Sequence, residues 1–208
     1  MYDREAVLIE FSKICGQLKI EYDLFRSLFN RGEPQTALLQ STAPYLFGDL
    51  YGIMRNNLFV GFCRVTDGAG SGQRLNLTSN FIVSLDWPSD VKARLEEVNA
   101  RLLSFRKFVE PARSKRIAHL DLRAQMEEKG PLGNFPIGAD ERFFNDLEEF
   151  LTTAHQAVNG GPFLLSIGGA SDTYQLIQAL VKAKLFDQCD KCPELDRMNA
   201  VLDTEASI

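Results

Sequence analysis

Two long stretches of the chain carry apolar residues at alternating spacings of three and four positions, and this period limits the fold more than any other feature. Such spacing places side chains on one face of an α-helix. The first seam predicts a helix over residues 3–30 and comprises Leu8, Phe11, Cys15, Leu18, Tyr22, Phe25 and Phe29. The second predicts a helix that begins near residue 88 and comprises Val91, Leu95, Val98, Leu102, Phe105 and Val109. We expect these two seams to pack together.

The same period predicts three further helices, over residues 44–67, about 140–158, and 172–185. Strands do not alternate with helices, and only residues 163–167 could form a short strand. The sequence therefore predicts an all-α fold, a bundle of four to five main helices. We assign residues 1–158 to the bundle and residues 159–208 to a C-terminal helical extension that is packed on it or loosely attached to it.

Three glycines fall inside the helix predicted at residues 44–67. Each costs about 1 kcal/mol relative to alanine in a helix interior, so we expect them to permit close packing against a neighbouring helix. They are Gly48, Gly52 and Gly61. A loop rich in glycine, residues 68–72, follows the helix and is predicted to be flexible.

The composition is that of a globular protein of 208 residues, 45% hydrophobic and 25% charged. No apolar run reaches the length of a membrane span, and the charged N-terminus is unlike a signal peptide, so a cytoplasmic location is expected. Cys15 and Cys63 lie within helical patterns and are predicted to be buried thiols. Cys189 and Cys192 form a CxxC pair without a second pair of ligands, so we predict that they bind no metal.

The charges are unevenly distributed along the chain. The formal net charge is −5, which argues against a general polyelectrolyte binder. Residues 101–123, however, hold seven Lys or Arg and two acids, a local balance of +5. This basic segment is either a phosphate-facing site or a solvated helix face.

Within the basic segment, the letters RSKRIAH over residues 113–119 combine the groups that cleavage of RNA needs. Histidine titrates near neutral pH and can transfer a proton at His119, while Arg113 can grip phosphate oxygens in a bidentate way. Lys115 and Arg116 precede His119 by four and three positions and would add charge beside it. Pro111 is predicted to kink or break the helix just before the motif, or to begin a new helix.

One histidine does not readily serve as both acid and base. Two copies of the motif, brought together by a two-fold axis, would supply both, so a homodimer is expected. The plainer interpretation is that His119 is a residue of the surface or core edge without chemistry. His155 lies at the edge of an apolar stripe away from any arginine cluster, and we assign it no role.

The wording RSKRIAHLD over residues 113–121 resembles that of HEPN domains, helical bundles marked by an Arg, four to six intervening residues and a His. It is most similar to the AbiU-type branch associated with abortive infection. The letters CRVTD over residues 63–67 also resemble that branch, and the likeness covers roughly residues 1–155.

The resemblance implies a HEPN-like bundle that acts as a metal-independent endoribonuclease, a toxin or antiphage effector, at a composite site in a dimer. It implies that Arg113 and His119 are catalytic and that Ser114, Lys115 and Arg116 contact RNA. No metal or cofactor is required, and the partners would be RNA, a second copy of the chain, and a cognate antitoxin or other protein. The residues that could support the site are Arg64, Asp67 and Asp121.

One departure from the family pattern bears on activity. The residue after the arginine is usually Asn, Asp or His in active members, whereas this chain has Ser114. The alternative function is therefore a non-catalytic HEPN-like module that binds RNA or a protein partner. A third hypothesis is a structural dimerisation module in which His119 has only a packing role.

Overall fold

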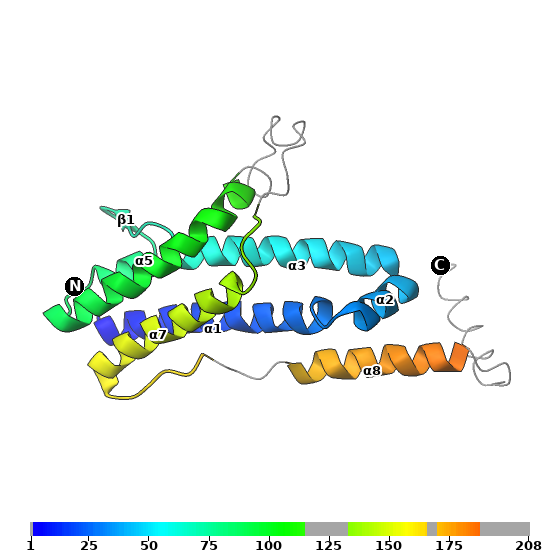
Figure 1. The fold of residues 1–208 in the computed structure, drawn as a ribbon. Coiled ribbons are helices and arrows are strands. Elements are labelled where there is room, and N and C mark those ends of the chain that lie inside the picture. Colours follow the sequence, from blue (N-terminus) through cyan, green and yellow to red (C-terminus); the bar gives the residue numbers. More distant parts are fainter. Residues whose placement is uncertain (1, 115–132, 166–169, 188–208) are drawn as a thin grey trace.

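The computed structural model describes residues 2–114, 133–165 and 170–187, and these residues form a bundle of helices (Figure 1). The all-α prediction is confirmed, since the sheet in the described part is only a ribbon in which β1 (Gly70–Ser71) pairs antiparallel with β2 (Arg74–Leu75). None of the described helices is both long and apolar enough to cross a membrane. The described part contains five long helices, α1 (Arg4–Phe29), α3 (Pro44–Val65), α5 (Ser89–Ala112), α7 (Ala139–Asn159) and α8 (Ala170–Asp187).

Two short helices connect the long ones. The apolar period does not predict helix α2 (Glu33–Thr42). Gly32 and Pro34 indicate the end of α1 in the sequence, but they also begin α2, with Pro34 in its first turn. Helix α4 (Ser79–Val83) begins where Thr78 Oγ1 accepts a hydrogen bond from the Phe81 N–H at 3.2 Å.

Helix α5 continues through Pro111 and ends at Ala112, so the predicted break before the motif is wrong. A proline removes one N–H from the helical ladder, but the backbone stays helical beyond it, with φ −58° and ψ −50° at Arg113. The Arg113 N–H still donates to the carbonyls of Val109 and Glu110 and completes that turn. The alternative prediction, a new helix through the motif, falls on residues 115–132, which lie outside the described residues.

The main core joins α1, α3, α5 and α7, and aromatic rings fill its centre. Phe62 of α3 lies with its ring centroid 5.1 Å from that of Phe105 and 4.9 Å from that of Phe143. The predicted direct packing of the two seams is wrong, because α5 packs chiefly on α7 and α1 packs on α3 and α7. Helix α7 can lie between them because its buried face is wide: Phe143, Phe144, Leu147, Phe150, Leu151 and Ala154.

A second, smaller core lies at the other end of α1 and α3. Leu28, Leu39 and Phe47 are buried there, and Ile177 and Leu180 of α8 pack against them. Helix α8 thus covers α1 and α2, which places residues 170–187 on the bundle (Figure 1). The boundary at residue 158 stays a prediction.

The buried polar and sulfur groups of the core are inert. Cys15 and Cys63 are buried free thiols, as predicted, while Cys189 and Cys192 lie outside the described residues. His155 is buried against α1: its Nε2 lies 2.8 Å from Ser12 Oγ, which itself donates to the Leu8 carbonyl. Ser12 is therefore the acceptor, and His155 is neutral with its proton on Nε2.

Of the three glycines in α3, only Gly61 is in close packing. A Cβ there would lie 2.5 Å from Leu18 Cδ1, whereas one at Gly48 or Gly52 would meet no atom within 4 Å.

We therefore expect Gly52→Ala to raise the free energy of unfolding by about 1 kcal/mol through helix propensity. Gly61→Ala should gain less or lose stability, because the buried Leu18 must move. Urea unfolding of both variants tests this, and equal gains would contradict the packing of Gly61.

His155 should make stability depend on pH. Burial lowers the pKa of His155 in the folded protein below its ordinary value of 6.5. At a pH between the folded and the unfolded pKa, the unfolded chain therefore takes up a proton that the native protein does not. Stability should therefore fall as pH decreases through 6.5, by at most about 1.4 kcal/mol per pH unit. Urea unfolding from pH 8 to 5 should give a shallower dependence in His155→Gln. Identical pH profiles for the two proteins would refute this assignment.

Candidate functional site

The structure describes the first two residues of the motif, Arg113 and Ser114, at the C-terminal end of α5. Lys115, Arg116, His119 and Asp121 lie outside the described residues. The site is therefore built from Arg113 and the groups around it.

Arg113 belongs to a cluster of four charged side chains where the end of α3 meets α5. Asp67 Oδ1 lies 2.6 Å from Arg106 Nη1, and its Oδ2 lies 3.9 Å from Arg113 Nη2. Arg106 Nη2 also donates to Glu110 Oε1 at 2.8 Å. We call Asp67, Arg106, Glu110 and Arg113 the Asp67 cluster. Its arginines share one face of α5 because seven residues, about two helical turns, separate them.

Hydrogen bonds donated by Asn80 to the backbone at Asp67 hold this residue in place. The Asn80 Nδ2 donates to the carbonyls of Thr66 and Asp67, at 3.1 and 2.9 Å. Asn99 of α5 in turn donates to Asn80 Oδ1 at 2.9 Å. Arg106 Nη1 donates to the Cys63 carbonyl at 3.1 Å, which also accepts from the Thr66 N–H, so α4 and α5 both donate to the backbone at the end of α3.

The two arginines of the cluster differ in their freedom. The Arg106 side chain is 15% exposed and has three partners, whereas that of Arg113 is 36% exposed and makes only the long contact with Asp67 among the described ion pairs. The hydrogen bond from Arg106 holds the pKa of Glu110 below its usual value, so Glu110 is ionised at neutral pH. The cluster thus contains two cations and two anions, and Arg113 is the cation with room for another ligand.

Cys63 lies beneath the arginines without being a nucleophile. Burial raises the pKa of its thiol to about 11, and the nearby Arg106 and Arg113 lower it only in part. The thiol is therefore protonated at neutral pH, and a protonated, buried thiol is unreactive.

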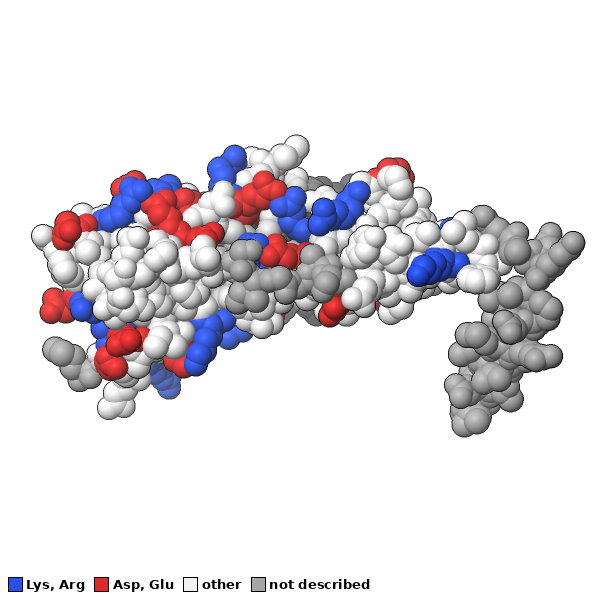
Figure 2. All heavy atoms as spheres, turned by 90° about the horizontal axis from the view of Figure 1, so that it is seen from below, with Lys and Arg blue, Asp and Glu red and all other residues white. Residues whose placement is uncertain are grey.

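Two of the seven cations of the basic segment are already closely paired with carboxylates within the described residues. Arg101 contacts Glu97, Asp146 and Glu149, and Arg106 is engaged in the Asp67 cluster. The face of the molecule in Figure 2 likewise shows Lys and Arg interspersed with Asp and Glu rather than one broad basic surface. Any attraction of phosphate therefore depends on a few local groups.

The structure brings together only some of the predicted site residues. Asp67 pairs with Arg106 and Arg113, whereas Arg64 is exposed on the α1 side of α3, in a pocket with Lys13 and Gln17. The Ser114 hydroxyl donates to the Glu110 carbonyl at 2.7 Å, within its own helix, and so its proton is engaged.

Sequence reasoning missed Arg106 and Glu110. The signal was present, since Arg106, Glu110 and Arg113 follow one another at spacings of four and three, which place them on one helix face.

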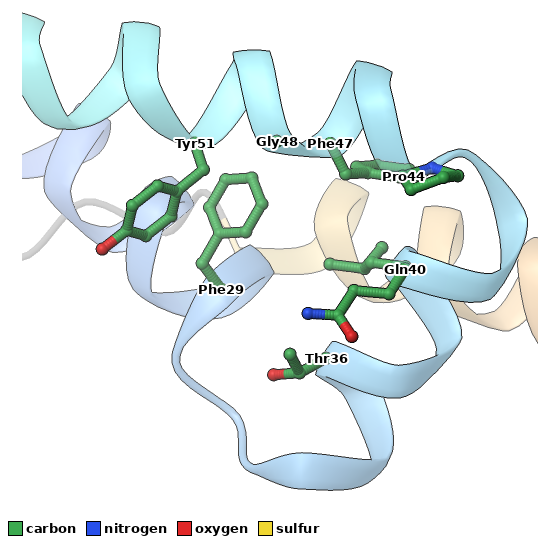
Figure 3. Close-up of a pocket in the computed structure, with 8 residues that line it drawn as sticks. Phe29, Thr36, Gln40, Pro44, Phe47, Gly48 and Tyr51 are labelled. Carbon is green, nitrogen blue, oxygen red and sulfur yellow. The ribbon is translucent and has the colours of Figure 1, made fainter.

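A separate pocket of about 550 Å³ lies at the far end of α3, between α1, α2 and α3 (Figure 3). The rings of Phe29 and Tyr51 line one side of it, and Thr36 and Gln40 of α2 line the other. None of its lining residues is charged. It is distant from the Asp67 cluster, because it involves the first two turns of α3 while Asp67 follows the last turn.

Comparison with known proteins adds one finding. A family model described as AbiU2, a HEPN family, matches residues 2–180. The matched region includes the whole Asp67 cluster, the motif, and the first part of α8. No curated protein and no solved structure matches the chain.

Removal of Arg106 should destabilise the fold, because Asp67 would lose its closest partner and the Cys63 carbonyl would lose one of its donors. We expect Arg106→Gln to lower the free energy of unfolding by about 1–3 kcal/mol. Lys107→Gln removes the same charge from the exposed neighbouring position and should change it by under about 0.5 kcal/mol. Urea unfolding of the full chain compares the two, and equal effects would count against a structural role for the cluster.

Proposed function

Because the chain belongs to the HEPN AbiU2 family, an abortive-infection family, we propose that it is a metal-independent endoribonuclease that acts in antiphage defence. The reaction is the attack of a 2′-hydroxyl on the adjacent phosphate, which requires the 2′-oxygen to lose a proton and the 5′-oxygen to gain one. These transfers can be carried out by side chains and need no metal.

The observation that carries this proposal is the position of Arg113. Its guanidinium lies at the end of α5 and is partly exposed, and its one ion pair with the described residues is the 3.9 Å contact with Asp67. Such a group can donate two parallel hydrogen bonds to phosphate and stabilise the charge that develops in the transition state. In the proposed site, His119 transfers the proton, and Lys115 and Arg116 bind the backbone of the RNA. Asp67 orients Arg113, and Asp121 would support the site from within the motif.

Two copies of the chain would form the complete site. Each copy supplies one histidine, whereas the reaction uses two proton transfers, and a two-fold axis would bring the second histidine at no cost in sequence. In this proposal the partners are RNA and a second copy of the chain, and a cognate antitoxin would restrain the enzyme.

A specific observation favours a second candidate, a non-catalytic module that binds RNA or a protein partner. Active HEPN domains usually carry Asn, Asp or His after the arginine, and here the hydroxyl proton of Ser114 is used by the Glu110 carbonyl. Arg113 would still bind phosphate in such a module, but the groups that arrange the reaction would be lacking.

The two candidates are separated by incubation of the purified protein with total RNA in excess EDTA. We expect cleavage by the wild type, and a decrease of about 10²- to 10⁴-fold in His119→Ala, because a proton-transfer group is lost. Arg113→Ala should weaken both binding and cleavage. Lys92→Ala, an exposed position at the start of α5, is the control for loss of positive charge.

Sedimentation of the same samples tests the composite site. A dimer is expected, and a strict monomer at the concentrations that cleave RNA would reject it. Full cleavage by His119→Ala would reject the catalytic role of that histidine, and a dimer that binds RNA without cutting it would establish the second candidate.

A further inference from the structure

An aromatic pocket of about 370 Å³ opens between α1, α3 and the start of α7. It lies farther along α3 toward Asp67 than the pocket of Figure 3, and Tyr51 borders both. We define the aromatic pocket by the residues that matter for its chemistry: Phe25, Tyr51, Arg55, Phe59, Phe135 and Asp140. It combines several ring faces with one cation and one anion, whereas the pocket of Figure 3 has no charged lining.

The rings of this pocket provide a surface for a planar group. Tyr51 is 41% exposed, and its ring centroid lies 5.4 Å from that of Phe25. The Arg55 guanidinium carbon lies over the Tyr51 ring, 5.6 Å from its centroid, so a cation borders the stacking surface. Exposed aromatic rings in a concave site mark a place where a ligand is bound, and a flat heterocycle stacks on such rings and on guanidinium planes.

The opposite side of the pocket presents a hydrogen-bond acceptor. Asp140 Oδ2 accepts a hydrogen bond from the Tyr22 hydroxyl at 2.8 Å. Burial and the Asp140 carboxylate raise the pKa of Tyr22, so the phenol stays protonated and keeps donating. A carboxylate has about four acceptor positions, and the remaining ones suit the N–H groups on the edge of a base.

The pocket is next to the proposed phosphate site. Gly133 lines the pocket with φ +88°, and a Cβ on it would lie 2.4 Å from Phe59 Cε2 and 3.2 Å from the Cβ of Ala112. Ala112 directly precedes Arg113. A wall of the pocket therefore touches the residue that leads into the motif, and this neighbourhood is so tight that only glycine fits.

We propose that the aromatic pocket binds an unpaired base of the RNA whose phosphate is held by Arg113. The base stacks on Tyr51 and Phe25, its N–H edge faces Asp140, and Arg55 balances the charge of a flanking phosphate. A base inside a duplex exposes no free face, so the pocket restricts the protein to single-stranded RNA. This inference rests on the proposed function, because it gives that site its substrate class.

The test measures binding rather than cleavage. The full-length protein is titrated into a fluorescein-labelled octamer of 2′-O-methyl RNA, which lacks the attacking hydroxyl, and into an abasic octamer with the same backbone; fluorescence anisotropy reports both affinities. We expect Tyr51→Ala to weaken binding of the octamer about tenfold, the effect of one lost stacking partner, and to leave the abasic strand unchanged. Tyr51→Phe, which keeps the ring, should bind like the wild type.

Tyr45→Ala is the matched control, because Tyr45 is on the same helix, is 89% exposed and does not line the pocket. Equal affinity of wild type and Tyr51→Ala for the octamer would overturn the base pocket, as would an equal loss on the abasic strand. If Tyr51→Ala binds the octamer as the wild type does while Arg113→Ala weakens binding of both strands, the proposed phosphate site stands and the base pocket fails. If the wild type binds neither strand, both proposals fail.

Discussion

The ring of Phe62 is the contact on which the rest of the bundle depends. It lies against Phe105 of α5 and against Phe143 and Phe144 of α7, so that one side chain of α3 joins three helices. Aromatic rings that meet edge to face bury large areas and fix the angle between the elements that carry them. Once α3 and α5 are fixed at Phe62 and Phe105, Arg106, which directly follows Phe105, lies beside Asp67 just past the end of α3. The charged cluster is therefore a consequence of the aromatic core rather than an independent device.

This dependence also explains why the cluster is neutral. A partly buried arginine such as Arg106 loses hydration and needs carboxylates close by, which Asp67 and Glu110 provide. Burial alone would lower the pKa of Arg106, but the hydrogen bonds to Glu110 and Asp67 raise it. The Arg106 guanidinium then connects the end of α3 to α5. Arg113, two turns later, retains the exposure that a ligand requires.

The helices could be predicted from the sequence because each buries one face, and the seam from Leu8 to Phe29 describes α1 to within a residue at its end. Their neighbours could not be predicted, because an apolar face does not specify its partner; α7, with its wide buried face, separates the two seams that we expected to meet. The predicted break at Pro111 was wrong because the loss of one backbone N–H does not by itself end a helix whose next residues keep helical backbone angles.

At the site, the resemblance identified Arg113 and Asp67, which the structure brings together, and also Arg64, which lies elsewhere. Residues three apart on a helix share a face only while the helix lasts, and α3 ends at Val65, between Arg64 and Asp67. Arg106 escaped notice because its spacing to Arg113 becomes meaningful only when α5 is known to run through Pro111.

The contact between Asp67 and Arg113 has a consequence for how any anion would bind. In the proposed site, a phosphate would bind the exposed part of Arg113 beside this carboxylate, whose Oδ2 lies 3.9 Å from Arg113 Nη2. The affinity would then be the attraction to the guanidinium less the repulsion by Asp67, which leaves little for a singly charged anion of the solvent. Part of the usual release of counterions is also lost, because Asp67 rather than a salt ion neutralises the arginine beforehand. In the proposed site, the carboxylate of Asp67 would thus favour polyanions over single anions.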